Sequence, residues 1–311
     1  MPLVRVWARV DPRLRLAALR SARSRRMPIR DMAPDAGFFG PASVTWPVMA
    51  EPALIAAGGA ALMLQMAHPL VAQGAIDHSM FAADPWGRLE RTMGWVTEVA
   101  FGSTTEAERA CERVNRIHVS IDGDLPSENA TRTVPAHARY TALDADLLLW
   151  VHASLLDTML RAYELMVRPL AREQRDRFVR EWNEVGRRLE IPPEQLWSTA
   201  ADLRAYVDRT IAAGEALPGA GSRDVARTVL YPPIDRAGRR AVFNAAKFVT
   251  VGLLPGAVRA AYGIRWSRKH ATAHRMACAA LRGAARVIPD SQRRSPVYDF
   301  AMRRAAGAGS R

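Results

Sequence analysis

The chain has 311 residues, of which 49% are hydrophobic and 24% charged, a composition typical of a globular protein with a buried core. Its two cysteines, Cys111 and Cys278, form no CxxC pair, which excludes a disulfide framework and a thiolate zinc cluster. The net charge is +13 and is concentrated at the ends, because residues 1–30 hold nine arginines and one aspartate, and residues 257–311 hold twelve basic and two acidic residues. Such ends can attract a membrane surface or nucleic acid.

The beginning of the chain lacks the plan of a signal peptide, because no apolar segment follows Arg25 and Arg26. We therefore expect a cytoplasmic protein. The longest apolar run, residues 53–76, is interrupted by polar residues and a proline: Gln65, His68, Pro69 and Gln73. In lipid these polar groups would stay unpaired, so the run predicts a buried core helix and not a membrane span.

Helical periodicity dominates the sequence and predicts an all-α fold. Residues 37–41 are expected to form a loop that brings Phe38 and Phe39 to the body. An apolar helix over 51–66 should break near His68 and Pro69, and a short helix should then run to Phe81. Asp84-Pro85 predicts a helix over 85–101. The remaining predicted segments are a helix from the capping box Ser103–Glu106 to Gly123, a loop over 124–142, and helices over 143–167, 170–190, 193–213, 236–252 and 266–287.

Two histidines fall within apolar helical stripes. His118 shares a stripe with Ala107, Cys111 and Val114, and His152 lies with Leu148 on the inner face of the helix over 143–167. A buried neutral imidazole needs a partner, which can be a peptide carbonyl or a metal ion. The periodicity predicts burial and leaves both partners open.

The helix before His118 carries cationic and hydroxyl groups on one face. Arg88, Arg91, Thr92 and Trp95 follow the spacing of one helical face that leads inward toward Val99. These groups need an anionic or polar partner. Carboxylates such as Glu98 or Asp122 could serve, as could a buried anionic cofactor, for which the arginine fork is well suited.

Common catalytic and metal-binding patterns are absent. No histidine has an acidic residue three positions before it, and the sequence has no HExxH, P-loop, GxGxxG or GxSxG motif. His270 and His274 are four residues apart, but Arg268, Lys269 and Arg275 surround them with positive charge, so we expect surface histidines there. No helix-turn-helix spacing supports a DNA-binding regulator, and we expect no specific nucleic-acid partner.

Several short motifs, in this order, resemble the oxygenase MpaB-like family, which includes the latex-clearing rubber oxygenases. The resemblance covers residues 37–298. The motifs that carry it are Gln65-Met66-Ala67-His68-Pro69-Leu70-Val71, Asp77-His78-Ser79, Arg88-Leu89-Glu90-Arg91-Thr92, Asn115-Arg116-Ile117-His118, Trp150-Val151-His152-Ala153, Leu254-Pro255-Gly256, Tyr262-Gly263 and Arg294-Ser295-Pro296.

The resemblance implies a single large helical domain with a globin-like core that binds haem b, and dioxygen-dependent cleavage of a carbon-carbon double bond in an isoprenoid chain. By motif order, His118 corresponds to the family's proximal iron ligand, and Arg88 and Thr92 to residues beside the haem. We add the inward His152 as a cofactor contact. One axial histidine leaves the opposite iron position for dioxygen.

The sequence departs from the rubber oxygenases at two points. Arg91 stands where they carry a distal lysine, and its guanidinium cannot ligate iron, so we expect an open or water-filled sixth position. Their glutamate base is also missing, since no acidic residue lies between Glu51 and Asp77. We therefore expect Asp77 or His78 as base, with Arg91 and Thr92 as further catalytic residues, and a small apolar substrate with an alkene or isoprenoid-like part in place of polyisoprene.

These observations give an expected organisation and one rival function. We expect an Arg-rich extension over 1–36, an oxygenase catalytic domain over 37–298 and a basic tail over 299–311. The rival to a haem-dependent oxidoreductase is a haem-free helical binding protein of the same fold. Either protein could contact the surface of a membrane peripherally through its basic ends.

Overall fold

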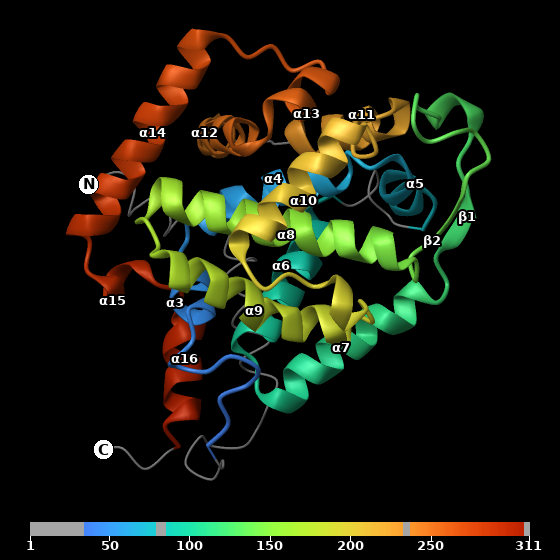
Figure 1. Cartoon of the computed structure of the whole chain (residues 1–311). Helices are drawn as coiled ribbons and strands as arrows, with labels where there is room; N and C mark the ends of the chain where they lie inside the picture. Colours follow the sequence, from blue (N-terminus) through green and yellow to red (C-terminus); the bar gives the residue numbers. More distant parts are fainter. Residues whose placement is uncertain (1–33, 79–84, 233–236, 308–311) are drawn as a thin grey trace.

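The long apolar helix α8 (Ala145–Met166) runs through the middle of the molecule (Figure 1). Asp144 caps it by accepting hydrogen bonds from the backbone N–H groups of Asp146 and Leu147, at 2.9 and 3.2 Å. Because α8 is apolar on most of its circumference, it needs neighbours on several sides. The structure is a computed structural model that describes residues 34–78, 85–232 and 237–307.

The helices that pack directly on α8 are α4 (Leu54–Gln65), α9 (Arg172–Arg188), α10 (Ala200–Ala213), α12 (Ala237–Leu253) and α14 (Arg268–Val287). The other helical elements of the described residues are α3 (Thr45–Met49), α5 (Pro69–His78), α6 (Pro85–Phe101), α7 (Thr104–His118), η2 (Ser127–Asn129), η3 (Pro193–Gln195), α11 (Ala220–Leu230), α13 (Gly256–Ala261), α15 (Asp290–Arg293) and α16 (Pro296–Ala305). The only described strands are the short β1 (Asp122–Asp124) and β2 (Arg139–Thr141), so the protein is a single all-α domain.

The predicted break at His68 and Pro69 is confirmed, because α4 and α5 meet there at an angle of 103°. No single helix of the described residues has the length and apolarity to cross a membrane. The bent pair α4 and α5 together has enough length and apolar composition to do so, and nothing beyond length and composition supports a crossing. Buried residues of α4 include Leu54, Met63 and Leu64. The helix is therefore the core helix that was expected for this apolar run.

The segment after α7 differs from the prediction. The helix expected to close at Gly123 ends at His118, and Asp122–Asp124 forms an antiparallel pair with Arg139–Thr141 inside the expected loop region. In this register Gly123 faces Tyr140, and a Cβ at Gly123 would lie 2.6 Å from the Tyr140 hydroxyl. Three-residue strands carry too little alternation to be recognised in a sequence.

Several helices of the described residues were missing from the sequence prediction, and the two longest of these are α11 and α16. The short α11 begins within a Gly-rich segment and shows only a few apolar residues, Val225 and Leu230 among the buried ones. α16 spans residue 299, where the basic tail was expected to begin, and packs against α6. Residues 1–33 of the extension expected over 1–36, the Asp84 cap, Phe81 and residues 308–311 lie outside the described residues.

Arg304 joins three distant segments from within α16. Its side chain is 2% exposed and donates to the carbonyls of Asp35 and Gly102 at 2.9 and 2.8 Å. Gly37 also belongs to this junction, because its φ of +65° and a Cβ only 2.2 Å from the Gly102 oxygen both require glycine. The cation therefore fixes the described N-terminal segment to the turn between α6 and α7.

Replacing this cation should destabilise the whole domain. Arg304→Ala leaves two buried carbonyls without a donor, and we expect a loss of about 3 kcal/mol in the free energy of unfolding. Arg303→Ala, at the exposed neighbour, is the matched control and should change stability by less than about 0.5 kcal/mol. Urea unfolding of both variants measures the difference, and equal losses would contradict the role of Arg304.

Candidate functional site

The α6–α7 pair carries Arg88, Arg91, Thr92 and His118, while Asp77 and His78 end α5 and His152 lies on α8. The capping box is present: the Glu106 N–H donates to Ser103 Oγ at 3.2 Å, and the Ser103 N–H donates to Glu106 Oε2 at 2.7 Å. Trp95 Nε1 donates to the Ala110 carbonyl at 3.2 Å, which joins α6 to α7 near the middle of both helices.

His118 is the last residue of α7 and is half-buried. Burial lowers its pKa, against a smaller opposite effect of the Glu190 carboxylate. Among the described residues no group hydrogen-bonds to its ring. Asn115, one turn earlier, donates to the Arg188 carbonyl at 2.8 Å and so fixes the end of α7 to α9. The lowered pKa favours a neutral ring, which is the form of histidine that binds metals.

The predicted face of α6 runs from solvent to core. Arg91 and Thr92 are exposed, Trp95 is half-buried and Val99 is fully buried. Position 88 lies in the first turns of α6, while the Arg88 side chain is outside the described part of the chain. Arg91 and Thr92 thus lie on the solvent-exposed part of this face.

His152 lies elsewhere, between α8 and α9. Its ring is 4% exposed and stacks on Trp197 with centroids 6.5 Å apart. Burial lowers its pKa to about 4, so the ring is neutral at pH 7. Nε2 has no hydrogen-bond partner among the described residues, and it would lie 3.2 Å from a Cβ at Gly186. The inward orientation predicted for His152 is confirmed, and its neighbours are protein side chains and backbone.

Asp77 and His78, at the end of α5, are held by different partners. Asp77 accepts hydrogen bonds from Gln73 Nε2 at 2.8 Å and from the Tyr140 hydroxyl at 2.5 Å, and burial, together with this carboxylate, raises the pKa of Tyr140. His78 Nε2 lies 2.9 Å from the Asp122 carbonyl. Because a carbonyl only accepts, Nε2 carries the proton and Nδ1 keeps a lone pair.

Two further histidines, His68 and His274, carry buried ring atoms. Burial lowers the pKa of His68 to about 4, and its Nδ1 is buried without a partner among the described residues. His274, expected at the surface, is 7% exposed, lies 3.3 Å from the Val249 carbonyl through Nε2, and contacts Cys278. The prediction for His274 was wrong because α14 turns this position toward α12, while its charged neighbours face solvent. His270 is exposed as predicted.

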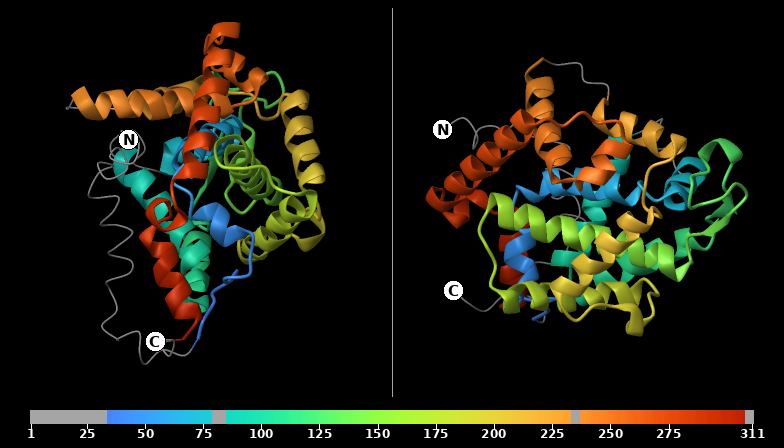
Figure 2. Two further views of the ribbon diagram at one scale, coloured as in Figure 1. Left: turned by 90° about the vertical axis from the view of Figure 1, so that its left-hand side faces the viewer. Right: turned by 45° about the horizontal axis from the view of Figure 1, so that its top comes forward.

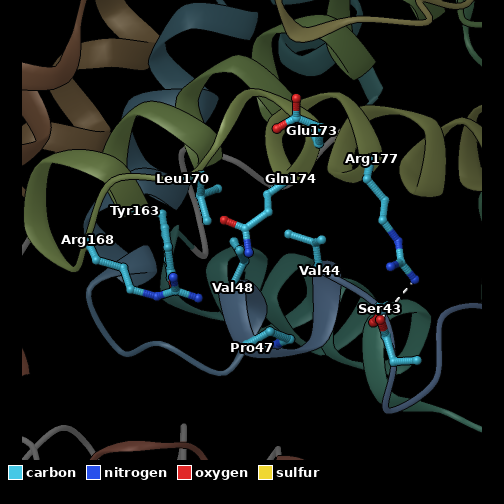
Figure 3. Close-up of a pocket in the computed structure, with 11 residues that line it drawn as sticks. Ser43, Val44, Pro47, Val48, Tyr163, Arg168, Leu170, Glu173, Gln174 and Arg177 are labelled. Carbon is cyan, nitrogen blue, oxygen red and sulfur yellow. Dashed lines mark hydrogen bonds between the residues drawn. The ribbon is translucent and has the colours of Figure 1, made fainter.

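A separate hollow lies between α3 and α9. It has a volume of about 300 Å³, and its lining includes Val44, Tyr163, Arg168, Gln174 and Arg177, as Figure 3 shows. A hydrogen bond of 2.9 Å from Arg177 to the Ala42 carbonyl closes one side. None of the predicted site residues lines this hollow, so it is distinct from the end of the α6–α7 pair.

Comparison with known proteins decides the family. Residues 46–283 match the family model described as the ER-bound oxygenase mpaB/B'/rubber oxygenase catalytic domain. The chain belongs to this family. It therefore carries an oxygenase catalytic domain and is an oxidoreductase. The matched range contains α3 to α13 and most of α14, with every predicted site residue. No curated protein and no solved structure matches the chain.

The buried His152 should make the stability of this oxygenase domain depend on pH. Its pKa is about 4 in the folded chain and 6.5 in its ordinary state, so the unfolded chain takes up a proton first as the pH falls. Stability is then complete above pH 6.5 and falls between pH 6.5 and about 4, by on the order of 3 kcal/mol.

Urea unfolding at a series of pH values measures this loss. As the pH is lowered from 6.5 to about 4, the free energy of unfolding of His152→Leu should fall less steeply than that of the wild type, whatever the absolute stability of the variant. His137→Asn is the control, because His137 is exposed and its φ of 61° suits asparagine. An unchanged pH dependence in His152→Leu would contradict the neutral buried state.

Proposed function

We propose that this chain is a haem b-dependent oxygenase that uses dioxygen on a small apolar metabolite with an alkene or isoprenoid-like part. The family supplies the oxygenase class. The observation that carries the cofactor assignment is the ring of His118, which is half-buried, has a pKa lowered by burial and makes no hydrogen bond to another described residue. When bound, haem supplies an iron centre that binds and activates dioxygen.

One histidine would be enough to hold haem in this chain. Among the described residues no group of three or more His, Cys, Asp or Glu side chains could hold a metal ion, and a haem iron needs only one protein ligand because the porphyrin supplies four nitrogens. His118 would hold the iron. Asn115 and its bond to the Arg188 carbonyl would orient the end of α7 on which this ligand stands.

Cations on α6 suit an anionic group. Position 88 lies in the first turns of α6, and Arg91 is exposed one turn further along. Their guanidinium groups keep a fixed charge and offer forked donors, which match the carboxylates of the haem propionates. Thr92 adds a hydroxyl beside Arg91. Further along α6 the residues of this face are apolar and buried, as Val99 is, so its polar groups lie only at the exposed part of the helix.

His78 is a better base than Asp77. Both oxygens of Asp77 already accept hydrogen bonds, from Gln73 and from Tyr140, and this reduces their availability for a substrate proton. The Asp122 carbonyl instead holds the His78 proton on Nε2, so Nδ1 can accept one. His78 is also exposed, as a group that meets a diffusing substrate must be. We assign the base to His78, with Asp77 as part of the hydrogen-bonded support.

The haem assignment predicts a specific spectral loss. Chain purified from haem-replete cells, or mixed with hemin, should show a Soret band that shifts on reduction with dithionite. His118→Ala should lose the bound haem because no other histidine can replace the ligand at that position. His137→Asn removes an exposed histidine and should keep the full band.

Two results would contradict the assignment. An unchanged haem content in His118→Ala, with the fold intact by circular dichroism, would exclude this ligand. Wild-type chain that takes up no hemin would favour the haem-free binding protein of the same fold.

The tautomer of the His78 ring can be measured without a substrate. Long-range ¹H–¹⁵N correlation spectra distinguish the two neutral tautomers, and we expect His78 in the Nε2-protonated form because the Asp122 carbonyl accepts that proton. A ring protonated on Nδ1 would leave no lone pair in the proposed position and would exclude His78 as the base.

A further inference from the structure

The outer face of α14 carries an unusual combination of charge and apolar surface. The helix has twenty residues and holds no acidic residue. Its inner face packs on α8 and α12, with Cys278 buried and Leu281 against the core. Arg282 donates to the Leu165 and Glu164 carbonyls, which fixes the inner face to the end of α8.

The basic residues of α14 are Arg268, Lys269, Arg275, Arg282 and Arg286, five in all. Arg282 faces inward and donates to backbone carbonyls. None of the other four has a carboxylate partner among the described residues. The hydrogen bond that Arg275 makes goes to the Thr272 hydroxyl at 3.0 Å. This differs from α9, where Arg187 and Arg188 pair with Glu184 at 2.7 and 3.1 Å. The outer face of α14 therefore keeps its full positive charge.

An apolar stripe runs along the middle of this face. Met276, Ala280, Gly283 and Val287 are spaced by four, three and four residues, which places them on one line of the helix. All four are exposed, and the exposed fractions of Met276 and Val287 are 67% and 79%. In Figure 1 α14 lies at the edge of the molecule, and the left view of Figure 2 brings it to the front.

The cations flank this stripe. Arg268, Arg275 and Arg286 form a second line about a quarter-turn away, because seven and eleven residues are both close to whole helical turns. Long arginine side chains can keep their charge at the level of lipid head groups while the stripe beside them enters the apolar boundary. A helix of this length is about 30 Å long, enough to lie flat on a bilayer.

We propose that the outer face of α14 is a docking surface for a membrane that contains anionic phospholipid. Positive charge without carboxylate partners complements the anionic head groups, and the exposed Met276 and Val287 gain from burial in the acyl boundary. Nucleic acid would use the cations and would gain nothing from the apolar stripe, so the stripe favours lipid. This inference does not depend on haem or on the oxygenase site.

Vesicle sedimentation with the full chain tests the proposal. We expect binding to vesicles of phosphatidylcholine mixed with phosphatidylglycerol, weaker binding at high salt, and little binding to phosphatidylcholine alone. Arg275→Gln with Arg286→Gln should weaken binding about fivefold for each charge removed. Met276→Gln with Val287→Gln should also weaken it, although the charge is unchanged.

The control removes two charges elsewhere. Arg132 and Arg209 are exposed and have no carboxylate partner among the described residues, so Arg132→Gln with Arg209→Gln matches the change in net charge and should bind as the wild type does. Circular dichroism and thermal unfolding verify that each variant is folded. The proposal is overturned if wild type does not bind anionic vesicles, if the control loses as much binding as the α14 charge variant, or if the stripe variant binds unchanged. It is also overturned if double-stranded DNA binds more tightly than the anionic vesicles.

Discussion

The close approach of small residues in α4 is the constraint on which the rest of the structure depends. Residues 56–61 are all alanine or glycine, and a Cβ at Gly59 would lie only 3.1 Å from Thr250 of α12. Gly58 faces Met93 of α6 in the same way, at 3.5 Å. Because α4 has almost no side-chain volume here, α6, α8 and α12 can all pack around it. A larger side chain at these positions would separate the helices that carry the candidate site.

Hydrogen bonds then fix the register of this packing. Gln65, at the end of α4, accepts from Trp150 Nε1 through its carbonyl at 3.2 Å and donates through its side chain to the Val151 carbonyl at 3.3 Å. The next residues turn at His68 and begin α5, which carries Asp77 and His78. The position of the proposed base is thus set by the α4–α8 contact, which includes Val151, the residue before His152 in α8. A change in the α4–α8 register would move both features together.

The sequence predicted those features that depend on local chemistry. The capping box at Ser103 and the break before Pro69 follow from single residues whose backbone preferences are strong, and both occur in the structure. The inward orientation of His152 follows from helical periodicity, which is reliable in a long apolar helix. His118 shows the limit of the same rule: Ile117, beside it in the expected stripe, is 57% exposed, because α7 ends there and the chain turns into β1.

Features that depend on tertiary contacts were not predictable in this way. His274 has charged neighbours in sequence, yet α12 covers it through the Val249 carbonyl and the gap at Gly252, where a Cβ would overlap the imidazole. The tautomer of His78 depends on a carbonyl 44 residues away. Neither contact leaves a pattern within one helix, so a single sequence contains no signal for it.

The arginine excess has two different physical meanings in this chain. A compositional bias toward arginine would place the residues without regard to partners, and the exposed arginines of α9 are instead paired along the helix with acidic residues such as Glu184. Exposed pairs of this kind contribute little stability, yet they neutralise the surface. On α14 the acidic partners are absent from the helix while exposed apolar residues remain. Exposed apolar residues are a liability for association, and the contact of this face with an anionic bilayer would cover them while the unpaired charge meets anionic head groups.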